Sequence, residues 1–151
     1  MTTPDGISTE DWDVAHELTV DLVNAEEGEE EEQCRHRLLE YLGELEEKYG
    51  PRPSILATRA DFMVDDVPGR LDLFSRAYAL SAKAGDLRNQ LHVALSLAEL
   101  YMEEFQDAGT AGMWLSRVKD HVERIGNDVD WREYERVRAA FEQLQLRKGL
   151  A

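Results

Sequence analysis

Apolar residues recur every three or four positions through most of this chain, and this spacing most constrains its fold. It places apolar side chains on one face of an α-helix, whereas a half-buried strand would alternate apolar and polar residues. The helical pattern occupies roughly residues 9–25, 29–49, 53–65, 66–84, 87–105, 111–125 and 131–148. Short connections between such segments favour antiparallel hairpins. The sequence therefore predicts an all-α fold of about seven antiparallel helices.

Local signals mark the ends of several predicted helices. Ser8 with Asp11, and Asp130 with Glu133, match the capping box. In this motif a cap side chain and a carboxylate three positions later each bond the other's backbone N–H. Gly50 followed by proline is a typical helix end. These signals predict where the first, second and last helices begin or end.

The chain is long enough for one domain with a substantial core. We expect residues 1–7 to be a flexible tail and residues 8–151 to form a single domain. Within it, the pattern predicts an acidic helical hairpin over 8–50, two repeat-like hairpins over 53–126 and a capping helix over 129–148.

Two stretches of the chain resemble each other. The letters FSRA at residues 74–77 match LSRV at residues 115–118, which is an offset of 41 residues. At the same offset the pair Gly85–Asp86 matches Gly126–Asn127. A period of 20–50 residues built from helical pairs is typical of an α-solenoid, in which each hairpin buries a face on the next. An irregular helical bundle with a chance internal similarity is the alternative.

Four positions link these stretches to a known motif. Ala98 and Tyr101 supply a small residue and an aromatic three positions later, while Phe74 and Ala77 supply an aromatic and an alanine in the other copy. The pattern resembles a degenerate tetratricopeptide repeat over about residues 53–126. Neither copy carries the whole motif, and the offset exceeds the family's repeat of about 34 residues. The resemblance implies a curved surface that binds a protein or a peptide.

Negative charge is concentrated in the first third of the chain. The net charge is −15, and residues 1–50 hold 16 acidic against 3 basic side chains. Such a field repels nucleic acid and anionic membranes and attracts basic partners, although acidic helix surfaces are also often simply solvated. Glu29, Glu30, Glu31 and Glu32 open the second predicted helix and are the candidate contacts for a basic partner. No apolar run approaches the length of a membrane span.

No motif of catalysis or cofactor binding is present in the sequence. It has no glycine-rich phosphate loop, no His-Glu-x-x-His pair and no nucleophile elbow. Cys34 and His36 lie two positions apart and point to different sides of a helix, which makes a poor metal pair. We expect no enzyme activity, cofactor or metal. The single cysteine and the absence of a secretion signal indicate a cytoplasmic protein.

Two functions from different classes follow from these features. The first is a non-enzymatic protein-interaction module, an adaptor or scaffold that binds a protein or peptide. For it, the resemblance places Ser54, Asp61, His92, Leu95 and Glu99 on the concave face. The alternative is an acidic inhibitor of a basic partner, such as an immunity protein against a bacterial nuclease toxin, because an acidic surface can mimic nucleic acid. Basic side chains of the last helix could also dock the acidic hairpin of a second copy, as in a homo-oligomer.

Overall fold

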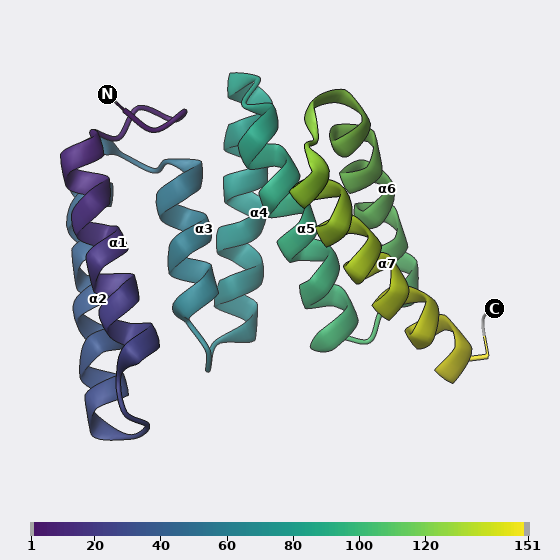
Figure 1. Cartoon of the computed structure of the whole chain (residues 1–151), viewed down its shortest axis with the longest axis horizontal. Coiled ribbons are helices and arrows are strands. Elements are labelled where there is room, and N and C mark those ends of the chain that lie inside the picture. The colour runs from purple at the N-terminus through teal and green to yellow at the C-terminus, as the bar shows by residue number, and fades with distance from the viewer. Residues whose placement is uncertain (1, 150–151) are drawn as a thin grey trace. The chain divides into compact units, whose positions relative to one another are not determined.

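The protein is all-helical in the computed structural model, which describes residues 2–149. These residues form seven α-helices and no strand. The helices are α1 Thr9–Asn24, α2 Glu29–Tyr49, α3 Pro53–Phe62, α4 Val67–Ala84, α5 Leu87–Glu103, α6 Ala108–Ile125 and α7 Asp128–Arg147. Figure 1 labels them in chain order and shows the short turns that join them. The predicted all-α class is confirmed. None of the helices in the described part is long and apolar enough to cross a membrane.

Contacts within the chain divide it into two compact units. The first unit is Met1–Leu73 and the second is Phe74–Ala151, so the boundary falls inside α4. Each unit has a hydrophobic cluster of its own. The predicted repeat region over 53–126 is therefore shared between the two units. The sequence pattern gave no sign of this boundary, because the helical spacing runs through α4 without a break.

The core of the first unit forms where α2 packs against α1 and α3. Leu38 and Leu42 of α2 are fully buried there. The expectation of a flexible tail over residues 1–7 is wrong where the structure describes it, because Ile7 is also fully buried in this core. The Thr3 N–H donates to the Ile7 carbonyl at 2.7 Å, which folds the segment back on itself. Burying an isoleucine side chain stabilises a fold by about 1.5–3 kcal/mol, enough to hold a short segment in place.

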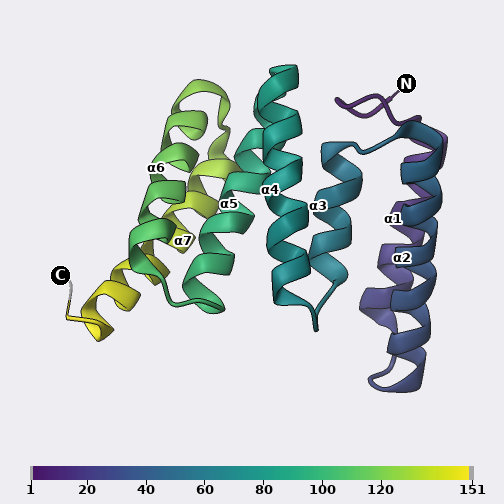
Figure 2. The ribbon, with the colours of Figure 1, turned by 180° about the vertical axis from the view of Figure 1, so that it is seen from behind.

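The core of the second unit lies between α5, α6 and α7, each of which contacts the other two. Ala94 and Ala98 of α5 and Ala111 of α6 are fully buried in it. Such small side chains let two helices approach closely, and α5 and α6 form the most extensive helix pair of this unit. Figure 2 shows this pair and α7 from behind.

The capping contacts at the starts of two helices differ from the prediction. Helix α7 begins three residues earlier than predicted, and its cap is Asn127. Asn127 and Asp130 form the capping box, so the predicted pairing of Asp130 with Glu133 is wrong. At α1 the Ser8 side chain accepts from the Asp11 N–H at 3.1 Å, as the capping box predicts. The reciprocal contact between the Asp11 carboxylate and the Ser8 N–H runs through the Tyr49 hydroxyl.

The glycines that close the two repeat-like stretches adopt different conformations. Gly85 has a φ of 68°, in the left-handed region that favours glycine, whereas Gly126 has a φ of −70°. At Gly126 the constraint is space instead, because an added Cβ would lie 2.5 Å from the Val122 carbonyl oxygen. The first helices of the two hairpins also differ, with 10 residues in α3 and 17 in α5.

Candidate partner-binding surface

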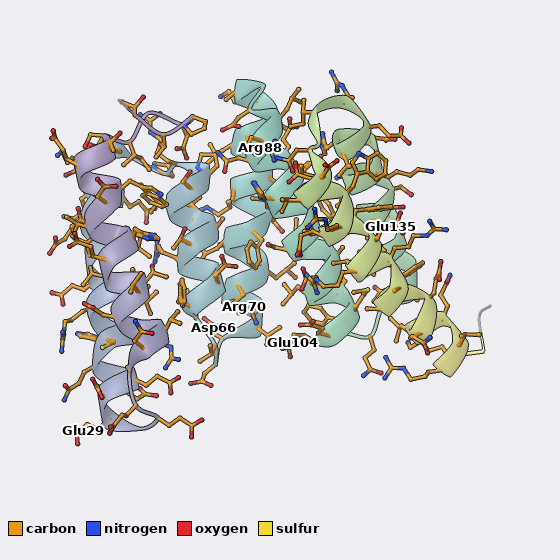
Figure 3. The ribbon with its side chains drawn as sticks, viewed as in Figure 1. Glu29, Asp66, Arg70, Arg88, Glu104 and Glu135 are labelled. Carbon is orange, nitrogen blue, oxygen red and sulfur yellow. The ribbon has the colours of Figure 1, made fainter. Side chains whose placement is uncertain are left out.

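A run of glutamates joins α1 to α2 and forms the most concentrated charge of the first unit. We call Glu26, Glu27 and Glu29–Glu32 the acidic turn. Gly28 separates its two parts with a φ of 105°, which only glycine adopts without strain. Five of the six glutamates are exposed, and Glu31 is half-buried. Figure 3 shows Glu29 at the tip of the α1–α2 hairpin. The turn therefore presents its carboxylates to solvent.

The protein compensates only part of this charge. Arg35 donates to Glu31 at 2.7 Å and lies 3.7 Å from Glu32. The Glu30 carboxylate accepts from the backbone N–H of Glu26 at 3.1 Å, and the positive end of the α2 dipole favours the glutamates of its first turn. Among the described residues, no basic side chain forms an ion pair with Glu26, Glu27, Glu29 or Glu30.

A second row of carboxylates runs along α1. Glu10, Asp13, Glu17 and Asp21 are all exposed, and their spacing of three and four residues places them on one side of the helix. The helix dipole favours Glu10 near the start of α1 but disfavours Asp21 in its last turn, which carries no basic residue. Helix stability therefore does not explain the presence of Asp21 at the end of this row.

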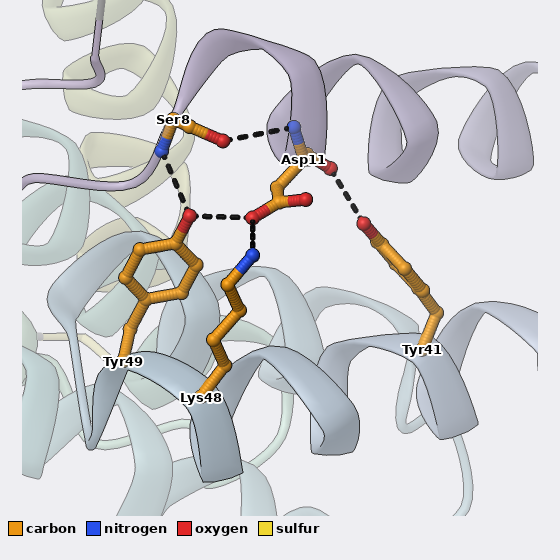
Figure 4. Close-up of polar contacts among 5 residues, drawn as sticks. All are labelled: Ser8, Asp11, Tyr41, Lys48 and Tyr49. Atoms are coloured by element: carbon orange, nitrogen blue, oxygen red, sulfur yellow. Dashed lines mark hydrogen bonds and ion pairs between the residues drawn. The ribbon is translucent and has the colours of Figure 1, made fainter.

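Polar contacts between α1 and the end of α2 fix the hairpin that carries both sets of carboxylates (Figure 4). The backbone N–H of Ser8 donates to the Tyr49 hydroxyl at 3.2 Å, and this hydroxyl donates to the Asp11 carboxylate. Lys48 donates to the same carboxylate at 2.7 Å, and Tyr41 donates to the Asp11 carbonyl at 2.9 Å. The Tyr49 hydroxyl thus bridges Ser8 and Asp11, the two partners of the predicted capping box.

These contacts also set the charge state of Asp11. Hydrogen bonds from Lys48 and Tyr49 hold the pKa of the Asp11 carboxyl below its ordinary value. The same contact with Asp11 raises the pKa of Lys48. The ion pair is therefore present over a wide pH range around neutrality, and it anchors the start of α1 to the end of α2.

The residues expected on a concave face are divided between the two units. In the first unit, Ser54 lies in the first turn of α3, and its backbone N–H donates to the Asp5 carboxylate at 2.7 Å. Asp61 is exposed near the end of the same helix. In the second unit, His92, Leu95 and Glu99 follow one another along α5. The structure brings these three together and leaves their relation to the first two undetermined.

The three α5 residues differ in how free they are to meet a partner. His92 is exposed, whereas Leu95 is half-buried and packs against the core of the second unit. Glu99 is half-buried and accepts from Arg136 of α7 at 3.1 Å, while Arg136 also donates to Glu133 at 2.8 Å. Of the three, Glu99 is the one already engaged in an ion pair within the unit.

Partial loss of hydration and neighbouring charges shift the pKa values of two of these side chains. Loss of hydration and the nearby Arg88 guanidinium lower the pKa of His92, and Asp130 partly opposes the change. Loss of hydration raises the pKa of Glu99, although Arg136 opposes it. His92 is therefore neutral at pH 7. The Glu99 carboxylate serves in an ion pair with Arg136 rather than as a free group for contact with a partner.

Open depressions adjoin these surfaces. One of about 430 Å³ borders Glu29, Glu32, Gln33, His36 and Arg37 on the first turns of α2. Another, of about 330 Å³, lies between α6 and α7 in the second unit. The first is lined in part by Glu29 and Glu32 of the acidic turn, and its rim carries both signs of charge.

Metal-binding geometry is not found in the part of the chain that the structure describes. No group of three or more His, Cys, Asp or Glu side chains within residues 2–149 is placed to hold an ion. Cys34 is buried, whereas the His36 side chain is 80% exposed, so the two do not face one another.

Several polar contacts escaped the sequence analysis. The Tyr49 hydroxyl at the α1 cap and the pairing of Arg88 with Asp130 join residues 41 and 42 positions apart. Neither contact has a local signal, because each depends on which helices pack together. The cluster of Tyr78, Trp114 and His121 had a partial signal in the helical spacing of its two α6 members.

No protein-family model, curated protein or solved structure matches this chain.

Proposed function

We propose that this protein is a non-enzymatic interaction module and that the α1–α2 hairpin binds a basic partner protein. The observation that carries the proposal is the largely uncompensated charge of the acidic turn, whose Glu26, Glu27, Glu29 and Glu30 are exposed and form no ion pair with any residue of 2–149. A fold does not gain stability from such repulsion, since like charges at this density disfavour the compact state. A complementary basic surface would relieve it.

The distribution of charge between the units supports the same assignment. Residues 1–73 carry 20 acidic and 6 basic side chains, a net charge of −14, whereas residues 74–151 carry 12 and 11, a net charge of −1. A charge confined to one unit produces a directional field that speeds association with a cationic surface. The hairpin that carries it is fixed by the Asp11 contacts, so its carboxylates are already arranged before a partner arrives.

The test compares two variants with the same change in net charge. In the first, Glu26, Glu27, Glu29 and Glu30 are replaced by Gln. In the second, four exposed carboxylates of the second unit are neutralised as the control: Glu103, Asp120, Glu123 and Asp128. Each protein is used as bait in a lysate of its source cells at low salt, and bound proteins are eluted with a salt gradient.

The expected result is a basic partner that the wild-type and control proteins retain and the acidic-turn variant loses. Raising the salt from about 0.05 M to 0.5 M should release it, because the Debye length falls from about 14 Å to about 4 Å. A partner that is held equally by all three proteins and resists salt would refute binding through the acidic turn.

The narrower form of this function is an inhibitor that occupies a cationic site, as an immunity protein does with a nuclease toxin. The rows of carboxylates on α1 and in the acidic turn support it, because rows of negative charge resemble a nucleic-acid backbone. Assaying the captured partner separates the two forms. An inhibitor abolishes its activity at a one-to-one ratio, whereas an adaptor leaves the activity intact.

The groove of a tetratricopeptide-like module is the other route to the same class of function. The closely packed α5–α6 pair supports it, and the exposed His92 of α5 is its candidate contact. The test is the double variant His92→Ala and Glu99→Gln, with Arg136→Gln as the control for the lost ion pair. If the double variant binds the captured partner as the wild type does, the groove is not the binding surface.

A further inference from the structure

Helix α6 presents a second face that is distinct from the one packed against α5. Its core face carries Ala111, Leu115 and Val118, which belong to the cluster of the second unit. Trp114 and His121 lie beside this core face, where Trp114 packs against the edge of the same cluster and both rings meet Tyr78 of α4. All of these residues belong to the second unit, whereas the acidic turn belongs to the first. This second face is therefore distinguished by a cluster of aromatic rings.

An arginine is held over the aromatic rings of this face. The Arg117 guanidinium carbon lies 4.5 Å from the centre of the Trp114 ring and 5.6 Å from that of Tyr78. The two rings meet edge to face, with centres 4.9 Å apart and planes at 84°. A guanidinium that stacks on a ring is restrained in orientation, while the N–H donors at its edge stay available.

No carboxylate within residues 2–149 forms an ion pair with Arg117. Among residues 2–149, Arg35, Arg59, Arg88, Arg136 and Arg138 pair with carboxylates. Arg117 is exposed and forms no ion pair, although Asp120 lies one turn away on the same helix. Its surroundings thus orient a cation without neutralising it.

A part-buried polar contact between Tyr78 and His121 adjoins these rings. The Tyr78 hydroxyl lies 3.3 Å from Nε2 of His121, which is 8% exposed. The other ring nitrogen, Nδ1, is buried without a hydrogen-bond partner. An unpaired buried polar atom costs stability, so core packing alone would favour an apolar residue at this position. Burial, Arg124 and Arg117 lower the pKa of His121 against the opposing Asp120, which leaves Arg117 as the cation of the cluster.

We propose that Arg117, oriented on Trp114 and Tyr78, binds a carboxylate of an acidic peptide segment in a partner protein. The two parallel N–H donors at the edge of a guanidinium match the two oxygens of a carboxylate. The exposed parts of the aromatic rings offer an apolar surface to the neighbouring side chain. A phosphate is the less suitable ligand, because a single arginine beside Asp120 supplies too little positive charge for a dianion.

This inference goes beyond the proposed function and is independent of it. It concerns the second unit and an acidic ligand, whereas the proposed function concerns the first unit and a basic partner. Losing either site leaves the other intact, so the two can fail separately.

The test is an NMR titration of the full-length ¹⁵N-labelled protein at about 0.15 M salt. The probe is an acetylated and amidated Leu-Glu-Glu-Leu peptide, with a Leu-Gln-Gln-Leu peptide and inorganic phosphate as comparisons. The Trp114 indole signal is identified with a Trp114→Phe variant. We expect the glutamate peptide to shift the signals of Trp114 and Arg117, and we expect little change with the other two probes.

The matched variants are Arg117→Gln and Arg124→Gln, since both remove one exposed positive charge from α6. Arg117→Gln should weaken binding by about three- to fivefold, the effect expected of losing an exposed ion pair. Arg117→Lys should weaken it less, because it keeps the charge but loses the paired donors. Arg124→Gln should bind as the wild type does.

Several results would overturn the proposal. They are equal binding by the Arg117→Gln and Arg124→Gln variants, equal shifts with the glutamine peptide or with phosphate, and no shift at millimolar glutamate peptide. The signals of the α5–α7 core show in the same spectra whether each variant is folded.

Discussion

The guanidinium of Arg88 donates to the carboxylate of Asp130 at 2.7 Å, and it joins the first turn of α5 to the first turn of α7. Asp130 is buried, and its other contact is the backbone N–H of Asn127 at 3.0 Å, within the capping box of α7. The Asp130 carboxylate therefore both takes part in the cap of α7 and links α7 to α5. Hydrogen bonds from Asn127 and Arg88 lower the pKa of Asp130 against the opposing effect of burial.

Replacing Asp130 by Ala should destabilise the protein by about 1–3 kcal/mol, because both the cap contact and the partner of Arg88 are lost. The measurement is urea-induced unfolding followed by circular dichroism. Asp128→Ala is the control, because it removes an exposed acidic residue from the same turn and should cost less than about 1 kcal/mol. Equal losses in the two variants would show that only the helix dipole matters here.

Replacing Tyr49 by Phe should lower the melting temperature by about 2–4 °C, since the hydroxyl that links the Ser8 N–H to Asp11 is removed. Calorimetry measures the change. The same exchange at Tyr101, which also lies half-buried on a helix, is the control and should have a smaller effect. The prediction fails if the phenylalanine variant at Tyr49 melts with the wild type.

Replacing Ile7 by Ala should destabilise the first unit by about 2–4 kcal/mol, because its buried side chain leaves a cavity. A flexible tail, as the sequence alone suggested, would show no change. Val23→Ala is the matched control, since Val23 is 72% exposed. Urea unfolding of the full chain distinguishes the two outcomes.

The stability of the protein should depend on pH through His121. Burial lowers the pKa of His121 in the folded state, so the unfolded chain binds more protons at mildly acidic pH. This contribution is complete above the ordinary pKa of 6.5 and is lost as the pH falls from there towards the folded-state value. The groups facing the ring are Tyr78 from α4, and Arg117, Asp120 and Arg124 from α6.

The measurement is the free energy of unfolding of the wild type and of His121→Gln between pH 8 and pH 5. The difference between them should move in favour of the variant as the pH falls below about 6.5. All other titrating groups are common to both proteins and cancel in this difference. Two parallel curves would rule out a titration of His121 coupled to folding.

The helix positions could be predicted because their signals are local. Apolar spacing and capping residues indicate the extent of α2 and α4 to within one or two residues. Ile7 could not be predicted to be buried, since a lone apolar residue in a polar segment has no periodicity. At α7 two overlapping capping boxes fit the sequence, Asn127 with Asp130 and Asp130 with Glu133. The structure has the Asn127–Asp130 box, and in it Asp130 also accepts a hydrogen bond from Arg88 of α5.

The candidate surface was predictable to a similar degree. The acidity of Glu29–Glu32 is visible in the sequence, and so is the partial compensation by Arg35 one turn later. The engagement of Glu99 by Arg136 was not visible, because it depends on how α5 and α7 pack. Side chains expected on a binding face are thus partly used within the unit itself.

The position of the unit boundary inside α4 determines how this protein can be dissected. In an α-helix each N–H bonds the carbonyl four residues earlier, so the amides of residues 74–77 depend on the carbonyls of residues 70–73. A fragment that starts at Phe74 would leave the first turn of its leading helix frayed. Asp66 accepts from the Gly69 N–H at 2.9 Å, so a fragment that starts just before Asp66 keeps the native cap. A truncation series should therefore place its cut before that residue rather than at the contact boundary.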